Sequence, residues 1–150
     1  MSVGTRVGQA SFRSPAEAAF VGLLAAAALA VQRLDEVCGA HGLTHTQYNV
    51  LRILRGVHPE GHPRFEVGRR LIARAPDVTR LLDRLERQGL VERGWARDNR
   101  RHSIARITRR GLDLLRTLDP DVERVRRAML GQLSDAELRQ LALAFDTMVA

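Results

Sequence analysis

The sequence contains no lysine, a single cysteine and few aromatic residues. One cysteine, Cys38, excludes a disulfide bond within the chain and suits a reducing compartment, so we expect a cytoplasmic protein. Aromatic residues make up 4% of the chain and apolar residues 45%, a balance that favours helices packed against helices. With 150 residues, the chain is long enough for one domain with extensions.

Long hydrophobic runs and catalytic motifs are missing as well. The longest apolar run, residues 18–31, is shorter than the roughly 20 residues that span a bilayer, so we expect no membrane partner. No nucleophile elbow, phosphate-binding glycine loop, HExxH pattern or well-placed pair of carboxylates occurs. We therefore expect neither an enzyme nor a bound cofactor.

The positive charge is concentrated in one part of the chain. All 24 cationic residues are arginines, and the formal net charge is +7. Residues 64–110 hold 14 arginines and 6 acidic residues, whereas the remainder holds 10 arginines and 11 acidic residues. A solvated surface scatters its charge, whereas a surface that binds a polyanion concentrates it. The middle third is therefore the candidate for nucleic-acid binding.

Three helix starts carry a capping box, in which Glu or Gln follows Ser or Thr by three residues. They begin at Ser14, Thr44 and Ser134. The first helix should run to about Cys38 and the second should end near Gly56. Residues 1–13 lack helical periodicity and are expected to form a loose arm.

The middle of the chain predicts a short helix, a turn, an amphipathic helix and a β-hairpin. After a loop at residues 57–64, a helix is expected within 65–75, and the next one begins at Ala75-Pro76-Asp77. That helix places its apolar residues on one face, namely Val78, Leu81, Leu82 and Leu85. Gly89 should end it, and the segments LVERGW and HSIARI read as two strands joined by a polar turn. Thr108 should cap a further helix, which Asp119-Pro120 kinks or interrupts.

This order of elements is a winged helix-turn-helix, a mainly α fold with a small β component. An α-helix fits the major groove of DNA when its outer face carries hydrogen-bonding side chains. Here that face offers Thr79, Arg80 and Arg84 near the helix start for base edges, and Arg87 further along for a phosphate. The alternative for each arginine is a solvated side chain paired with Asp83 or Glu86.

The hairpin turn at residues 97–101 is a second candidate contact. A hairpin beside the recognition helix lies over the adjacent minor groove, whose negative potential attracts arginine. Asp98 would be repelled by phosphate unless it orients an arginine through a paired hydrogen bond. The alternative is an ordinary charged hairpin tip.

The segments LTHTQYNVLRIL and DVTRLLDRLERQGLVERGWARDNRRHSIARITRRG resemble the MarR family of bacterial transcription regulators. The resemblance covers about residues 15–150. It implies that Thr79, Arg80 and Arg84 lie on the recognition helix and that Asp98 and Arg100 are paired wing residues, with either Arg100 or Arg101 in the minor groove. It also implies a homodimer on double-stranded DNA.

The resemblance further implies a division of the chain. Residues 1–13 would be the arm, 14–43 an N-terminal dimerisation helix, 44–108 the DNA-binding domain and 109–150 the C-terminal dimerisation helices. The last helix carries an apolar stripe that a small winged domain could hardly cover, namely Leu138, Leu141, Phe145 and Met148. A two-fold dimer would read an imperfect palindrome with half-sites about 10 bp apart.

Three inputs could regulate such a protein. A small-molecule effector is the usual one in the family, and its candidate residues are His41, His45, Tyr48 and Arg52, with capping, packing and exposure as their alternative roles. Metal sensing would use His58, Glu60 and His62, or His41 and His45, but no third clustered ligand is evident. Cys38 follows Asp35 and Glu36, which disfavour a reactive thiolate.

The interpretation is a sequence-specific regulator, a repressor released from its site by an effector. Two rival hypotheses remain, namely a winged-helix module that binds protein and an architectural DNA binder without a sensor. The segregated charge argues against the protein-binding module, which would not need such an excess of arginine. A protein-binding face should instead carry exposed apolar anchors.

Overall fold

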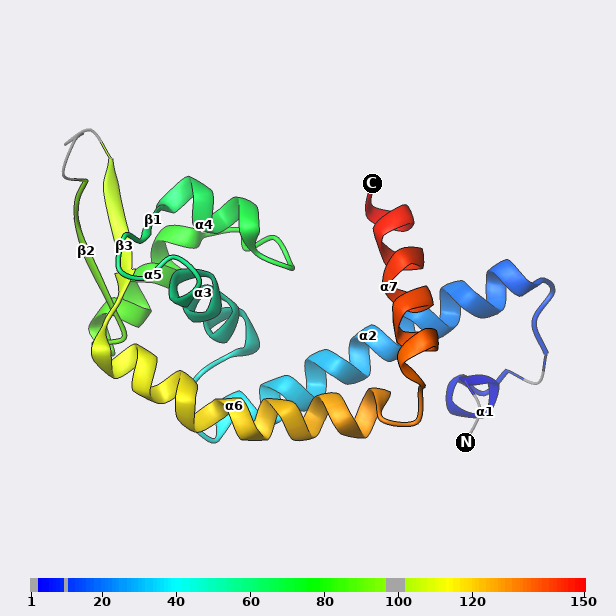
Figure 1. The fold of residues 1–150 in the computed structure, drawn as a ribbon. Helices are drawn as coiled ribbons and strands as arrows, with labels where there is room; N and C mark the ends of the chain where they lie inside the picture. The colour runs from blue at the N-terminus through cyan, green and yellow to red at the C-terminus, as the bar shows by residue number, and fades with distance from the viewer. Residues whose placement is uncertain (1–2, 10, 97–101) are drawn as a thin grey trace. The chain divides into compact units, whose positions relative to one another are not determined.

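The computed structural model describes residues 3–9, 11–96 and 102–150. Its elements in chain order are α1 (Val3–Val7), α2 (Pro15–Gly39), α3 (His45–Arg55), β1 (His62–Pro63), α4 (Arg64–Arg70), α5 (Val78–Arg87), β2 (Val91–Trp95), β3 (Ser103–Ile107), α6 (Arg109–Leu130) and α7 (Asp135–Val149) (Figure 1). The chain forms two compact units, one spanning Asp35–Asp121 and the other combining Met1–Leu34 with Val122–Ala150.

The unit Asp35–Asp121 is the predicted winged helix-turn-helix. Three helices, α3, α4 and α5, are followed by the hairpin of β2 and β3, which Figure 1 shows as two long neighbouring strands. The antiparallel sheet has the order β1-β3-β2, and Arg93 of β2 lies opposite Ala105 of β3. The mainly helical fold class with a small sheet is therefore confirmed.

The hydrophobic core lies entirely in this unit among the described residues. Its fully buried large side chains are Leu51 and Leu54 of α3, Leu82 and Leu85 of α5, and Leu115 and Leu118 of α6. Strand residues Val91, Ile104 and Ile107 close the core from the side of the wing. Burial of side chains of this size stabilises a fold by roughly 1.5–3 kcal/mol each. The core thus fixes α5 and the hairpin on one scaffold.

Helix starts predicted from capping boxes are observed. Thr44 and Ser134 each accept a hydrogen bond from the backbone of the third helical residue, whose side chain returns to the cap. At the start of α2, Ser14 Oγ accepts from the backbone N of Glu17 at 3.1 Å. The Glu17 carboxylate, however, accepts from the backbone N of Arg13 and not from that of Ser14, so this box is shifted by one residue.

Several sequence predictions need correction. The expected loose arm contains helix α1, and the expected loop at 57–64 ends in strand β1, which pairs with β3. Pro76 precedes α5 and does not occupy its first turn, because Asp77 is the cap. Helix α6 continues through Pro120, so of the two expected effects of Asp119-Pro120, a kink or an interruption, the interruption is wrong.

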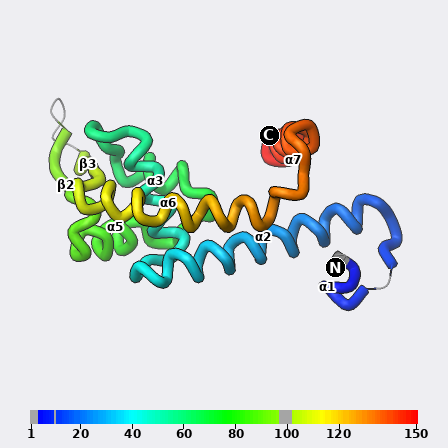
Figure 2. Tube along the Cα trace, turned by 60° about the horizontal axis from the view of Figure 1, so that its bottom comes forward, coloured from blue at the N-terminus to red at the C-terminus, as the bar shows by residue number. Residues whose placement is uncertain are grey.

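Among the side chains that the structure describes, none in the other unit is buried in the single chain. Helix α7 has no buried residue, and the one buried residue of α2, Cys38, belongs to the winged unit. Figure 2 shows α7 joined to the end of α6 by a short turn. By length and composition, α2 is long and apolar enough to cross a membrane. The helix is longer than the apolar run at 18–31, and the expected absence of a membrane partner stays a prediction.

Candidate nucleic-acid interface

Both ends of helix α5 are fixed by its own sequence. At the start, the Asp77 carboxylate accepts a hydrogen bond from the backbone N of Arg80 at 3.0 Å. At the end, Gly89 has a φ of +70°, and the backbone N of Leu90 donates to the Leu85 carbonyl at 3.0 Å. This pairing is a Schellman motif, for which glycine is the favoured residue. The helix therefore has a defined orientation on the core.

The outer face of α5 carries the predicted arginines. Leu82 and Leu85 are buried on the inner face, and the exposed side chains of the outer face are Arg80, Arg84 and Arg87. Arg80 Nε lies 3.2 Å from Asp77 Oδ2, and Arg87 Nε donates to the Asp83 carbonyl at 3.3 Å. Arg84 has no ion pair within the described parts of the chain. The helix thus presents a row of solvent-facing guanidinium groups.

The acidic side chains of α5 are turned toward the wing. Arg93 of β2 donates to Glu86 through Nε at 2.9 Å and Nη2 at 2.6 Å, and through Nη2 to Asp83 at 2.5 Å. Hydrogen bonds to these carboxylates, first of all Glu86, raise the pKa of the Arg93 guanidinium. The alternative in which Asp83 or Glu86 neutralises Arg80, Arg84 or Arg87 is not what the structure shows. The two carboxylates bind the wing instead.

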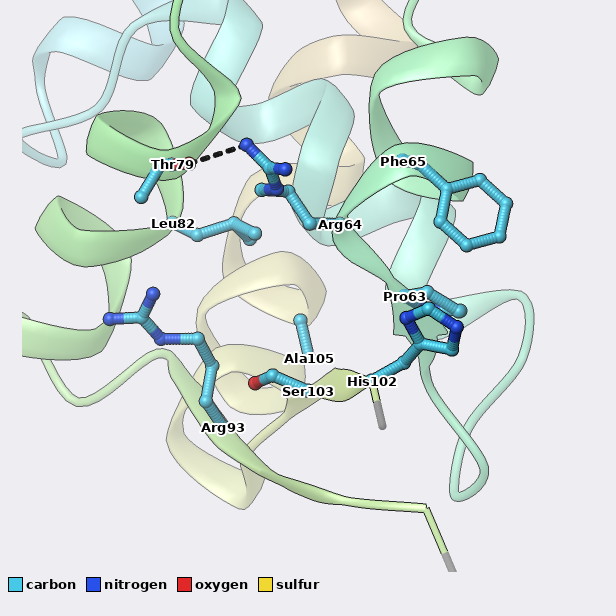
Figure 3. A pocket seen from close by; sticks show the side chains of 9 residues that line it. All are labelled: Pro63, Arg64, Phe65, Thr79, Leu82, Arg93, His102, Ser103 and Ala105. Carbon is cyan, nitrogen blue, oxygen red and sulfur yellow. Dashed lines mark hydrogen bonds between the residues drawn. The ribbon is translucent and has the colours of Figure 1, made fainter. Parts of the chain in front are cut away.

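Thr79 lies at the start of α5 and makes a contact that the sequence did not predict. Its Oγ1 accepts a hydrogen bond from Arg64 Nη1 at 3.0 Å, and Arg64 is the first residue of α4 (Figure 3). Arg64 and Arg93 are therefore missed members of the candidate interface. Arg64 could have been found as the first residue of the arginine-rich segment, whereas the partners of Arg93 depend on how the hairpin packs on α5.

A cavity of about 400 Å³ opens between α5, the start of α4 and the hairpin. Figure 3 shows Arg64 and Thr79 on one side of it and Arg93 on the other, with Leu82 and Ala105 between them. The remaining lining residues are Pro63, Phe65, His102 and Ser103. The cavity has an apolar floor with cationic and hydroxyl groups along its edge.

The wing was predicted to make a second contact with DNA. Strands β2 and β3 pair in register from Val91 opposite Ile107 to Trp95 opposite Ser103, which carries the hairpin away from the core. Trp95 is 62% exposed. The predicted wing residues Asp98, Arg100 and Arg101 lie outside the described residues.

The four candidate effector residues lie around the start of α3. The backbone N and ring Nδ1 of His45 contact Asp35 Oδ1 at 2.8 and 2.9 Å, and this contact lowers the pKa of Asp35. Tyr48 is buried, which raises the pKa of its hydroxyl, and the exposed Arg52 lies 5.9 Å from the centre of its ring. His41 is half-buried. His45 and Tyr48 thus take part in contacts within the fold, as their alternative roles predicted.

The other two candidate inputs were metal and thiol chemistry. Within the described residues, no cluster of three or more His, Cys, Asp and Glu side chains could hold a metal ion. Cys38 is fully buried, and burial together with the charge of Asp35 raises the pKa of its thiol to about 11. A reactive cysteine needs the opposite shift.

Comparisons with known proteins match this chain to MarR family regulators. The family model described as "MarR family" matches residues 41–102. A MarR transcription factor of known structure from Planctomyces limnophilus is 36% identical; the match covers 91% of this chain and 99% of that one, with a TM-score of 0.69.

Two further relatives illustrate the range of similarity. The regulator MhqR of Bacillus subtilis is 31% identical over 98 residues, which are 65% of this chain and 66% of MhqR. The chain thus spans between 51% and 66% of the length of the curated relatives it matches. Sco3205, a MarR family regulator from Streptomyces coelicolor solved in complex with DNA, is 21% identical; the match covers 92% of each of the two chains, with a TM-score of 0.81. The similarity to Sco3205 shows a shared fold.

Proposed function

The chain belongs to the MarR family of transcription regulators, and from this premise we propose that it binds double-stranded DNA sequence-specifically as a homodimer. The observation that carries the proposal is the division of charge on α5. Its exposed arginines face solvent, while Asp83 and Glu86 are held by Arg93. A carboxylate that is held by an arginine repels phosphates less than a free one, so this pairing favours the approach of α5 to DNA.

In this proposal α5 is the recognition helix and the hairpin is the wing. Arg80 and Arg84 are placed for base edges in the major groove, and Arg87 for a phosphate. Asp98, Arg100 and Arg101 would act at the adjacent minor groove, with Asp98 orienting one of the two arginines. Replacement of Arg100 and Arg101 together should lower the salt dependence of DNA binding, because fewer counterions are released.

Dimerisation is proposed from the apolar surface of the second unit. Its helices expose large apolar side chains in the single chain, among them Phe20, Leu24, Leu143, Phe145 and Met148. Obligate dimer interfaces resemble a protein core divided between two chains, and a second copy would cover these residues. We propose that residues 14–43 and 109–150 form this interface and that α2 uses its apolar length there and not in a membrane.

Membership of the family supports a proposal on regulation and location. We propose a cytoplasmic repressor whose DNA affinity falls when a small molecule binds, with His41, His45, Tyr48 and Arg52 as the candidate contacts. Such an effector acts by binding one of two conformations more tightly than the other. Neither catalysis nor a cofactor forms part of the proposed function.

The experiment compares Arg84→Ala with Arg13→Ala, which removes an exposed arginine outside the proposed DNA-binding and dimer regions. Fluorescence anisotropy would measure binding to a duplex that the wild-type protein selects from a random library. Loss of a base contact should weaken DNA binding by Arg84→Ala by roughly 1–3 kcal/mol on this duplex, whereas Arg13→Ala should bind like wild type. Equal affinities of the two variants would remove Arg84 from the interface. A wild-type protein that selects no sequence would favour the protein-binding or architectural alternative.

A further inference from the structure

We propose that Arg64 binds a phosphate of the DNA backbone and that Thr79 positions it for this contact. The inference deepens the proposed DNA-binding function and rests on it. Arg64 is exposed at the first position of α4, and Thr79 is half-buried at the second position of α5. The 3.0 Å hydrogen bond from Arg64 Nη1 to Thr79 Oγ1 joins the two helices at the edge of the cavity (Figure 3).

The charge of Arg64 is available to a ligand. Within the described parts of the chain, Arg64 forms no ion pair. Its neighbours on α4 differ, because Arg69 and Arg70 both bind Glu66. Across the cavity, Arg93 is held by two carboxylates. Arg64 is therefore the cation on this cavity whose charge the described residues leave uncompensated.

The position of Arg64 beside α5 favours contact with the phosphate backbone of DNA. An α-helix with its side chains is about 10–12 Å across, and the major groove is about 12 Å wide. A recognition helix therefore fills the groove, and groups that flank it face the phosphates along the groove's edge. Arg64 flanks α5 at Thr79. A guanidinium has five N–H donors, and Thr79 takes one of them, which leaves donors for phosphate oxygens.

The cavity gives such a phosphate room beside the guanidinium. Its volume of about 400 Å³ lies between Arg64 and the hairpin, and the Ser103 hydroxyl is a further polar group in its lining. Leu82 and Ala105 at its floor offer no acceptor that would compete for the guanidinium. Arg64 therefore meets DNA where the recognition helix and the wing converge.

This assignment changes the role of Thr79. The Thr79 hydroxyl acts as an acceptor for Arg64, and an arginine held in one orientation loses less side-chain freedom when it binds. Thr79 then contributes equally to every DNA sequence. A threonine that reads a base edge would instead contribute to the selected sequence alone.

The test uses the 150-residue chain with Arg64→Gln, Thr79→Val, the double variant, and Arg13→Gln as the charge-matched control, because Arg13 is exposed and lies outside the proposed DNA-binding and dimer regions. Anisotropy is measured on the selected duplex and on a random-sequence duplex between about 50 and 200 mM salt. Arg64→Gln should weaken binding to both duplexes by the same factor and lower the salt slope by about one per protomer, whereas Arg13→Gln should leave the slope unchanged. Arg64→Lys, which keeps the charge, should restore the slope.

Thr79→Val should weaken both duplexes equally and should add nothing to Arg64→Gln, because the two residues act through one contact. A wild-type slope in Arg64→Gln would overturn the phosphate contact. The positioning role would be overturned if Thr79→Val lost affinity for the selected duplex alone and the double variant showed the same additional loss. If the wild-type protein bound neither duplex, the proposed function itself would fail.

Discussion

The Arg93 guanidinium on strand β2 forms two hydrogen bonds to the Glu86 carboxylate on helix α5, at 2.6 and 2.9 Å. The same guanidinium binds Asp83 one turn earlier on the helix. The wing is therefore joined to the recognition helix by side chains as well as by the short chain segment between them. The contact also pairs both acidic side chains of α5 with the wing.

Replacement of Arg93 by Met should remove the ion pairs that join the wing to α5. Each partly exposed ion pair is worth roughly 0.2–1 kcal/mol, so the free energy of unfolding should fall by about 1 kcal/mol. DNA affinity should fall as well, because Asp83 and Glu86 would then stand unpaired near the phosphates. Urea unfolding and anisotropy would measure the two effects. Arg116→Met on α6, which removes an exposed ion pair with Asp113, is the control. If the two variants had the same free energy of unfolding and the same DNA affinity, the ion pairs of Arg93 would not join the wing to α5.

Gly61 should not tolerate a side chain. It has a φ of +78°, and a Cβ added there would lie 2.2 Å from the carbonyl oxygen of Ala105 on β3. Gly42 is the matched control, because its φ of +73° is similar but nothing lies within 4 Å of the added atom. Gly42→Ala should lower the free energy of unfolding by about 1–2 kcal/mol for the left-handed backbone alone. Gly61→Ala should lower the free energy of unfolding by more than Gly42→Ala does. Equal decreases for the two variants would mean that the segment before β1 can move away from β3 without cost.

Acid should remove the contribution of Asp35. Hydrogen bonds from the backbone and ring of His45 hold the pKa of Asp35 below its ordinary value of 3.8. A carboxylate whose pKa is lowered by folding stabilises the protein above its ordinary pKa and loses this effect as the pH falls through the lowered value. Asp35→Asn should therefore be less stable than wild type at neutral pH, and the difference should shrink below about pH 4.

The measurement is unfolding at one protein concentration across this pH range. A constant gap between Asp35→Asn and wild type would contradict the prediction.

Cys38 should be inert in the folded protein. Burial and the charge of Asp35 raise its pKa to about 11, and only the thiolate reacts as a nucleophile. At pH 8 roughly one thiol in a thousand would be ionised. A disulfide reagent should therefore label Cys38 only after denaturation, and peroxide should leave DNA binding unchanged. Rapid labelling of the native protein would show that the thiol is accessible.

Much of the winged unit could be predicted because its signals are local. The capping box at Thr44, the glycine after α5 and the apolar stripe ending at Leu85 each depend on residues within a few positions of one another. The hairpin was predicted for the same reason, from alternating strands on either side of a polar turn. Caps, turns and apolar stripes of this kind depend on neighbouring residues and not on tertiary contacts.

The contacts that the sequence did not predict depend on distant parts of the chain. Strand β1 is only two residues long and exists because β3 lies beside it. Arg64 meets Thr79 through the packing of α4 on α5, and Arg93 meets Glu86 through the packing of the hairpin. The sequence therefore indicated a charged surface on α5 but not which arginines its carboxylates bind or which hydroxyl holds Arg64.

The most direct test of the central claim is a hydroxyl-radical footprint on the duplex that the protein selects. The account holds that two copies each place α5 in a major groove and the wing in the adjacent minor groove. It predicts two protected regions related by two-fold symmetry, with centres about 10 bp apart on one face of the DNA. Protection of a single asymmetric half-site, or none at low salt, would contradict it.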